Sequence, residues 1–473
     1  MSTTRAIAHN TLVQLIGKIV STGLGLLALG MLTRTLGQEK FGWYITAITF
    51  LQFAGILIDF GLIPVTAQML GEGKIEEKKL LKNLLGFRFA TALIFFAVLP
   101  IIALFFPYPR EVKIAIGLLT ISFLAIAMNQ VFTGFYQKRL KMHVQVIGEN
   151  ISRIVLVVGL WFLIREGSSF LPLMGMIAIS SVVYVAFLWI SAAKDAPVGF
   201  AFDSYVWREI IKKMWPIAVS IIFNVIYLKG DILILSIYRT QSEVGLYGAP
   251  YRVIDIIAQT ALMLMGVMLP ILSDHWTKNL KEEFGRRYQQ AFDSMMVMAI
   301  PLMVGTIILA DKIMAMVAPE FNQSGAILRI LAVAVFGLFL GAVFGHVAVA
   351  INRQKQTMWI YISDAIITLA GYLVFIPLYG FWGAAWMTVF SELYAGIMLW
   401  ITIRRHSGQK LKFAVFNKII IAGLFMGIIL LLLNFLSLLL LIFIGASIYA
   451  LALILLKGIK KETIREIFSS PKN

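Results

Sequence analysis

Basic side chains lie deep inside apolar stretches of this chain, where they could bind an anionic group. Lys18 belongs to a polar series, Asn10, Gln14, Lys18 and Thr22, whose members are four residues apart. Side chains at this spacing lie on one face of a helix. A charge at mid-bilayer costs roughly 2.5–3.5 kcal/mol on insertion scales, so it usually faces a cavity or a partner. Because no acidic residue lies near Lys18 on its own stretch, we interpret Lys18 and Gln14 as binding-site residues.

Two further polar stripes occur in the N-terminal half. Gln145, Glu149 and Arg153 are again four residues apart, and Gln52 and Asp59 are seven apart on one helical face. Three stripes in one half predict a shared wet cavity, and Arg153, Gln52 and Arg34 join Lys18 as candidate ligands of an anion. One alternative stays open, in which Glu149 and Arg153 neutralise each other and bind nothing.

The C-terminal half carries more acidic residues within its apolar stretches. Lys229 lies near the centre of one stretch, and Asp231, two residues on, points away from it on a helix. Asp231, Asp255 and Asp364 are interpreted as candidate ligands of a coupling cation or proton, together with Asp59 of the first half. The alternative is that Asp255 or Asp364 simply neutralises Lys229.

The elements that position these residues are transmembrane helices. The chain is 60% hydrophobic and 14% charged, whereas soluble domains are about 25% charged. Many runs reach the roughly 20 apolar residues that a spanning helix needs, and they do not alternate as barrel strands do. We predict an all-α polytopic membrane protein with about fourteen spans: 10–32, 42–70, 84–106, 113–136, 144–164, 170–192, 214–238, 247–273, 290–310, 326–351, 357–377, 380–403, 415–434 and 436–456.

The basic residues predict the orientation of these spans. Most of the 41 Lys and Arg residues lie in every second loop and at the two ends of the chain. By the positive-inside rule, those loops and both termini are cytoplasmic, which places the protein in the cytoplasmic membrane. The absence of cysteine excludes a disulfide framework and thiolate metal sites. No zinc, nucleotide or nucleophile motif is present, so we expect a non-enzymatic protein without a metal or bound cofactor.

The two halves resemble each other. RT at 34–35 is followed by Glu39, Gly42 and Tyr44, and RT at 239–240 is followed by Glu243, Gly245 and Tyr247. Six spans form an even number, so such repeats share one orientation, as in some transporters. We predict an N-terminal lobe over 1–200, a C-terminal lobe over 201–405, and two extra spans with a cytoplasmic tail over 406–473. Chance similarity between apolar helices is the alternative.

Several motifs resemble a known family. They are RTLG at 34–37, FGWY at 41–44, DFGL at 59–62, PEF at 319–321 and AILRIL at 326–331. Their order resembles that of oligosaccharide-lipid flippases, the polysaccharide-transport members of the multidrug/oligosaccharidyl-lipid/polysaccharide exporter superfamily. The resemblance implies two six-helix lobes in a V around a central cavity, alternating access, and a polyprenyl-pyrophosphate-linked oligosaccharide as cargo for surface polysaccharide assembly.

The resemblance also implies roles for particular spans. Related lipid II flippases form a sodium site between spans 7, 11 and 12, for which Asp231 and Asp364 are the matching candidates here. It implies Na⁺ or H⁺ coupling, a groove for the polyprenyl tail beside spans 13 and 14, and contacts with membrane lipids and with the polysaccharide assembly machinery.

Two other functions remain open. A multidrug or organic-cation exporter of the same superfamily is disfavoured by Lys18 and Lys229 but supported by Asp255 and Glu392. An integral-membrane polysaccharide polymerase or glycosyltransferase needs a sizeable external loop or domain. The external loops here are short, and the first offers only Glu39.

Overall fold

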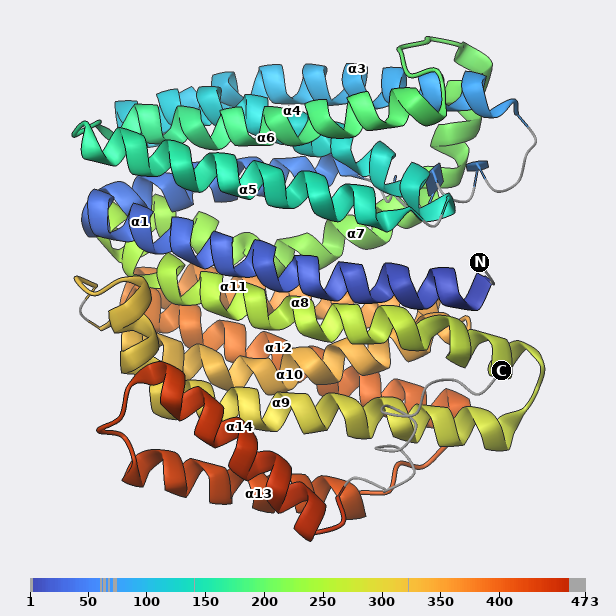
Figure 1. Ribbon diagram of the computed structural model, residues 1–473, viewed down its shortest axis with the longest axis vertical. Helices are drawn as coiled ribbons and strands as arrows, with labels where there is room; N and C mark the ends of the chain where they lie inside the picture. The colour runs from blue at the N-terminus through green and yellow to red at the C-terminus, as the bar shows by residue number, and fades with distance from the viewer. Residues whose placement is uncertain are drawn as a thin grey trace. The chain divides into compact units, whose positions relative to one another are not determined.

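The structure is a computed structural model that describes residues 3–59, 62, 65, 66, 69, 70, 75–139, 141–321 and 323–458, with only the backbone described at 3–16, 54, 56–59 and 215–228. The helices are α1 (Thr3–Asp59), α3 (Glu77–Leu104), α4 (Arg110–Lys138), α5 (Met142–Arg165), α6 (Phe170–Asp195), α7 (Ser204–Tyr238), α8 (Gln241–Thr277), α9 (Lys281–Val317), α10 (Ser324–Ala350), α11 (Gln354–Tyr379), α12 (Phe381–Ser407), α13 (Ala414–Leu432) and α14 (Leu438–Leu455) (Figure 1).

A glycine divides α1 into the first two expected spans. Gly37 has φ 66° and ψ −178°, a backbone conformation that residues with a Cβ avoid. With α1 counted as two segments, the described residues contain fourteen helical segments and no strand. The predicted all-α fold class and the expected number of helices are therefore confirmed.

Several helices are longer than the expected spans, because turns that contain charged residues continue the helix beyond its apolar part. The span expected at 290–310 lies within α9, Lys281–Val317. Its first turn carries Glu282 and Glu283, whose negative charge suits the positive end of the helix dipole. Twelve stretches of the described residues are long and apolar enough to cross a membrane, with α1 counted once.

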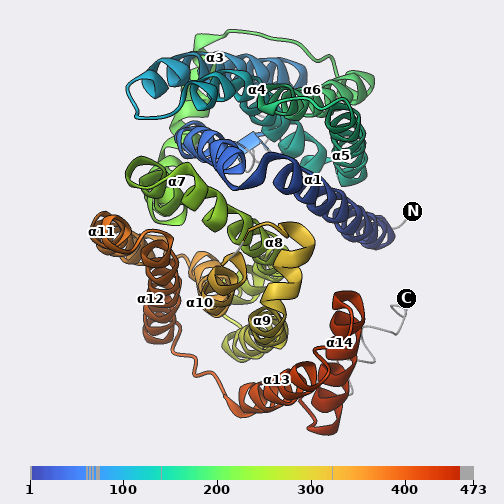
Figure 2. The same cartoon turned by 90° about the vertical axis from the view of Figure 1, so that its left-hand side faces the viewer.

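The chain forms two compact units, Met1–Gly245 and Leu246–Asn473. In the first unit, α4 packs between α3 and α6, and α5 packs against α1 and α6 (Figure 2). In the second unit, α10 packs against α9 and α12, and α13 and α14 pack against α9. Helix α7 belongs to the first unit, and the expected division at 1–200, 201–405 and 406–473 stays a prediction.

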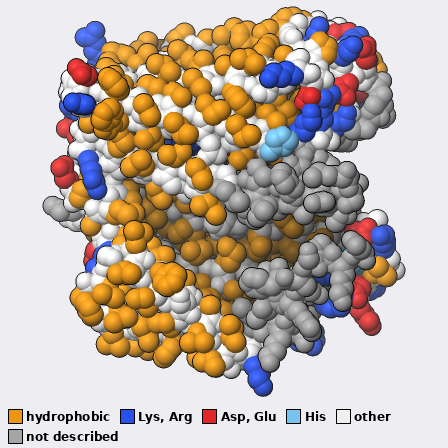
Figure 3. Space-filling model, viewed as in Figure 1, with side chains coloured by type: hydrophobic (Ala, Val, Ile, Leu, Met, Phe, Trp, Pro, Cys, Tyr) orange, Lys and Arg blue, Asp and Glu red, His pale blue; other side chains and the backbone are white. Residues whose placement is uncertain are grey.

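Large apolar side chains cover much of the surface. Figure 3 shows them over most of the viewed face, with charged side chains toward the helix ends. Leu439 of α14 is 74% exposed and Phe435 of the preceding loop is 79% exposed. Apolar patches of this extent mark contact with a membrane or a protein partner. With the long apolar helices, they identify the chain as a multi-pass membrane protein.

The two similar hairpins meet through their glycines inside the first unit. A Cβ on Gly42 would lie 1.7 Å from the carbonyl oxygen of Gln241, and a Cβ on Gly245 would lie 2.1 Å from that of Gln38. Gly42 follows Gln38 by four residues, as Gly245 follows Gln241. The Ser242 hydroxyl also donates to Gln38 Oε1 at 3.1 Å. The contact is therefore reciprocal, as expected when a repeated motif packs against its own copy.

We predict that Gly42→Ala destabilises the protein by about 1–3 kcal/mol, because its methyl group would overlap the Gln241 backbone and force the helices apart. Thermal unfolding of the detergent-solubilised protein measures this. Gly266→Ala is the control, because a Cβ there meets no atom within 4 Å. Equal unfolding temperatures for the two variants would contradict the packing described.

Candidate functional site

Helices α1 and α5 share a polar seam in the first unit, which we define as Lys18 and Ser21 of α1 with Glu149, Asn150 and Arg153 of α5. The Asn150 amide donates to the carbonyl oxygen of Gly17 at 3.1 Å. This bond to the backbone of α1 holds the two helices side by side. Lys18 of the first expected stripe lies 3.4 Å from Glu149 of the stripe on the fifth span, so the two stripes meet at this point.

Glu149 is the shared acceptor of this seam. Its Oε1 accepts a hydrogen bond from the Ser21 hydroxyl at 2.6 Å and lies 3.4 Å from Lys18 Nζ. Ser21 is buried, the Lys18 side chain is 36% exposed and that of Glu149 is 23% exposed. Lys18 has no acidic residue nearby on its own helix, as the sequence shows, but packing against α5 supplies Glu149.

Arg153 lies one turn beyond Glu149 on α5. Its guanidinium carbon lies 3.9 Å from the place that a Cβ on Gly25 of α1 would occupy. Within the part of the chain that the structure describes, Glu149 pairs with Lys18 rather than with Arg153. The open alternative of a self-neutralised Glu149–Arg153 pair is therefore disfavoured, and Arg153 remains a half-buried cation beside α1.

The remaining candidate ligands of an anion are more dispersed. Arg34 is exposed near the end of the first segment of α1, and Gln52 is half-buried on the second segment. Lys229 of α7 is also half-buried. The side chains of Gln14 and Asp59 lie outside the described residues. The structure thus brings Lys18 and Arg153 to one seam, and the anion-binding roles of all six candidates stay predictions.

A buried carboxylate lies between α11 and α12 in the second unit. Asp364 is fully buried. Its Oδ1 accepts from the Thr368 hydroxyl at 2.9 Å and its Oδ2 accepts from the Ser391 hydroxyl at 3.0 Å. Among the described residues, no ion pair is formed by Asp364. A carboxylate transferred from water into such a place needs donors or a cation to offset its lost hydration.

The other two candidate acids with described side chains have different surroundings. Asp231 of α7 is fully buried, and its Oδ1 accepts from the backbone N–H of Ile232 at 2.7 Å. Asp255 lies 3.6 Å from Arg252 Nη1 on the same helix, α8. An arginine one turn away therefore partly neutralises Asp255, which the sequence interpretation did not anticipate.

Sequence reasoning missed the hydroxyl groups that hold these carboxylates. Ser21 is three residues after Lys18, so it shares the face of α1 that meets Glu149, and Thr368 is four residues after Asp364, on the face of the carboxylate that it supports. This spacing could have identified them. Ser391 lies on another helix, and no local pattern connects it to Asp364.

Family models and known proteins match this chain over most of its length. Residues 7–276 match the family model described as "Polysaccharide biosynthesis protein", and residues 198–450 match the model described as "Lipid II flippase MurJ". A probable low-salt glycan biosynthesis flippase, Agl15 of Haloferax volcanii, is 22% identical over 89% of each chain. A putative O-antigen transporter of Shigella flexneri is 23% identical over 80% of this chain and 93% of its own.

The fold is also that of a solved structure. The inward closed conformation of the lipid II flippase MurJ superposes with a TM-score of 0.76 at 16% identity, over 97% of this chain and 100% of that one. At this identity the likeness establishes the fold alone.

We predict that Ser21→Ala destabilises the protein by about 1.5–3 kcal/mol, because it removes a buried hydrogen bond to a charged acceptor. Thermal unfolding measures the loss. Ser447→Ala is the control, since that exposed hydroxyl bonds only to the Phe443 carbonyl of its own helix. If both variants unfold like the parent protein, Glu149 is not held by Ser21 as described.

Proposed function

We propose that this chain, which belongs to the polysaccharide biosynthesis protein family, flips a lipid-linked oligosaccharide across the cytoplasmic membrane by alternating access. The family model covers more than half of the chain, and the relatives described above are a probable glycan flippase and a putative O-antigen transporter. Such a cargo has a head too polar to cross hydrocarbon unaided. The observation that carries the proposal is the α1–α5 seam, where two half-buried cations lie between two long apolar helices.

The seam is suited to a polyprenyl-linked pyrophosphate. The Lys18–Glu149 distance of 3.4 Å is longer than the 2.7–2.9 Å typical of charge-assisted bonds between nitrogen and oxygen. The Ser21 bond keeps the Glu149 carboxylate satisfied when Lys18 turns toward a ligand. Lys18 and Arg153 would then bind the phosphate oxygens, with Lys229 as a third cation.

Coupling to a cation gradient is the second part of the proposal. Asp364, Thr368 and Ser391 place three side-chain oxygen groups around one buried point. Oxygen ligands suit hard cations, and a proton on Asp364 would equally remove the buried charge. We place the coupling Na⁺ or H⁺ at this carboxylate, and Asp231 of α7 stays a separate candidate in the first unit.

The orientation of the chain in the membrane is also part of the proposal. Both termini would lie in the cytoplasm, because the basic residues gather in the loops on that side. The relatives are flippases or transporters, and we assign this chain no catalytic step. Its product, a lipid-linked unit on the outer face, would pass to enzymes of surface polysaccharide assembly.

We predict that Lys18→Ala, Arg153→Ala and Lys229→Ala each slow translocation about tenfold, the effect of removing a hydrogen bond to a charged group. The measurement uses proteoliposomes loaded with a labelled polyprenyl-pyrophosphoryl oligosaccharide. Lys278→Ala is the control, because Lys278 pairs with Asp274 at an exposed helix end. Normal turnover in all three variants would refute the site, and transport of organic cations instead of the glycolipid would refute the cargo.

We predict that Asp364→Asn abolishes the acceleration of transport by an imposed Na⁺ or H⁺ gradient, because the amide carries no charge to be compensated. Downhill exchange of the labelled lipid should persist. Asp274→Asn, at an exposed position, serves as the matched control. Undiminished acceleration in Asp364→Asn would remove the coupling role from this residue.

A further inference from the structure

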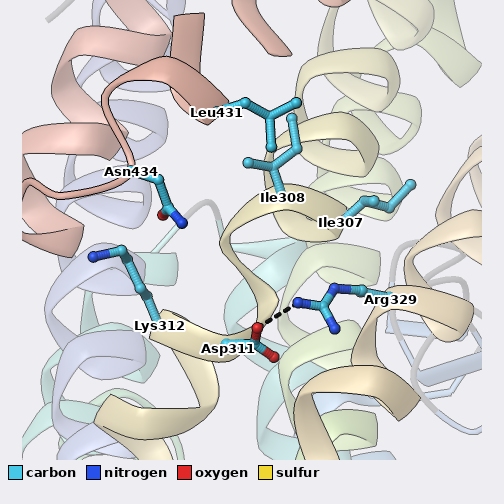
Figure 4. A pocket seen from close by; sticks show the side chains of 7 residues that line it. All are labelled: Ile307, Ile308, Asp311, Lys312, Arg329, Leu431 and Asn434. Atoms are coloured by element: carbon cyan, nitrogen blue, oxygen red, sulfur yellow. Dashed lines mark hydrogen bonds and ion pairs between the residues drawn. The ribbon is translucent and has the colours of Figure 1, made fainter. Parts of the chain in front are cut away.

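A further polar site lies in the second unit, on helices other than the α11 and α12 that hold Asp364. A cavity of about 360 Å³ opens where the ends of α9 and α10 meet the loop between α13 and α14 (Figure 4). Its lining residues are Ile307, Ile308, Asp311, Lys312, Arg329, Leu431 and Asn434. The cavity therefore combines charged and apolar walls from three helices and one loop.

The polar wall carries one net positive charge. Arg329 Nη2 is bonded to Asp311, and the Arg329 side chain is 43% exposed. Lys312 Nζ donates to the carbonyl oxygen of Leu436 at 2.8 Å, which ties the α13–α14 loop to α9. A guanidinium has five N–H donors and an ammonium has three, so both groups retain donors for a ligand beside the exposed Asn434 amide.

The apolar wall continues onto the outer surface of α13. Leu431 is 61% exposed at the cavity, and Leu432 next to it is 72% exposed. Exposed Ile428 lies one turn before Leu432 on the same helix. Charged groups near the ends of α9 and α10 thus lie beside exposed apolar groups in the last turns of α13. This is the polarity of an amphiphile that lies at the surface of a bilayer.

We propose that this cavity binds the phosphodiester headgroup of an anionic phospholipid. The phosphate would bind Lys312 and Arg329, and an acyl chain would follow Ile308 and Leu431. Asp311 lowers the positive charge of the wall, which suits a singly charged phosphodiester better than a pyrophosphate. The lipid is thus a resident of the bilayer, distinct from the proposed cargo, and by the expected orientation it belongs to the outer leaflet.

The functional consequence is control of the α13–α14 loop. Lys312 joins this loop to α9, and a headgroup at Lys312 would add a bond on the same side chain. A bound lipid therefore fastens the two extra helices to α9, and their attachment depends on the composition of the membrane.

Binding to the purified full-length chain in detergent tests the proposal by native mass spectrometry. Phosphatidylglycerol and phosphatidylcholine with the same acyl chains are compared in the parent protein, Lys312→Gln and Arg329→Gln. We expect preferential binding of phosphatidylglycerol, weakened about tenfold in each variant. Asp311→Asn should bind it at least as well as the parent, which a purely structural Arg329–Asp311 pair does not predict.

The control variants remove the same kinds of cationic side chain at positions that do not line the cavity. Lys418 donates to the backbone carbonyl of Lys457, much as Lys312 donates to that of Leu436. Arg286 forms an ion pair with Glu283, much as Arg329 does with Asp311. Lys418→Gln and Arg286→Gln should leave the preference intact. Retained preference in both Lys312→Gln and Arg329→Gln overturns the proposal. Displacement of the lipid by equimolar glycerol phosphate or inorganic phosphate overturns the lipid assignment in favour of a simple anion site.

Discussion

A carboxylate inside an apolar helical bundle must be hydrogen bonded or paired, and this requirement organises both polar regions of the protein. Glu149 meets it with a serine hydroxyl and a lysine from α1, and Asp364 meets it with two hydroxyls from α11 and α12. Because hydroxyl groups donate hydrogen bonds to both carboxylates, neither acid depends on a cation alone to offset its lost hydration. In the proposed function, the first arrangement releases Lys18 to a ligand, and the second holds an acid whose charge a coupling cation or proton neutralises.

The sequence predicts the helices well because the bilayer imposes a length and a composition that a linear pattern reveals. It predicts pairing less well because pairing depends on which helices pack together. Glu149 has Arg153 one turn away on its own helix, yet α1 brings Lys18 into contact instead. Spacing could have identified Thr368 beside Asp364, whereas Ser391 is 27 residues away and only the packing of α12 reveals it. Helix ends were also underestimated, since charged turns continue α9 beyond its apolar part.

The fold and the site contribute different parts of the functional conclusion. A TM-score of 0.76 at 16% identity establishes a shared arrangement of helices, and one arrangement of helices can serve unrelated cargoes. The chemistry of the cargo therefore has to come from side chains. Our proposal assigns an anion to the two cations on one seam of the first unit, and a coupling cation to the acid that neutral donors hold in the second.

The paired glycines have a consequence beyond packing. Gly42 packs against the backbone just before Gly245, and Gly245 packs against the backbone just before Gly42. The contact is therefore self-complementary, as at the interface of a twofold symmetric dimer, although both sides belong to one chain. A side chain at either position opens the same junction. The free-energy costs of enlarging both positions are therefore not additive, since the first enlargement already removes most of what the second would disturb. Such a junction couples the two hairpins, and neither glycine is free to change without regard to the other.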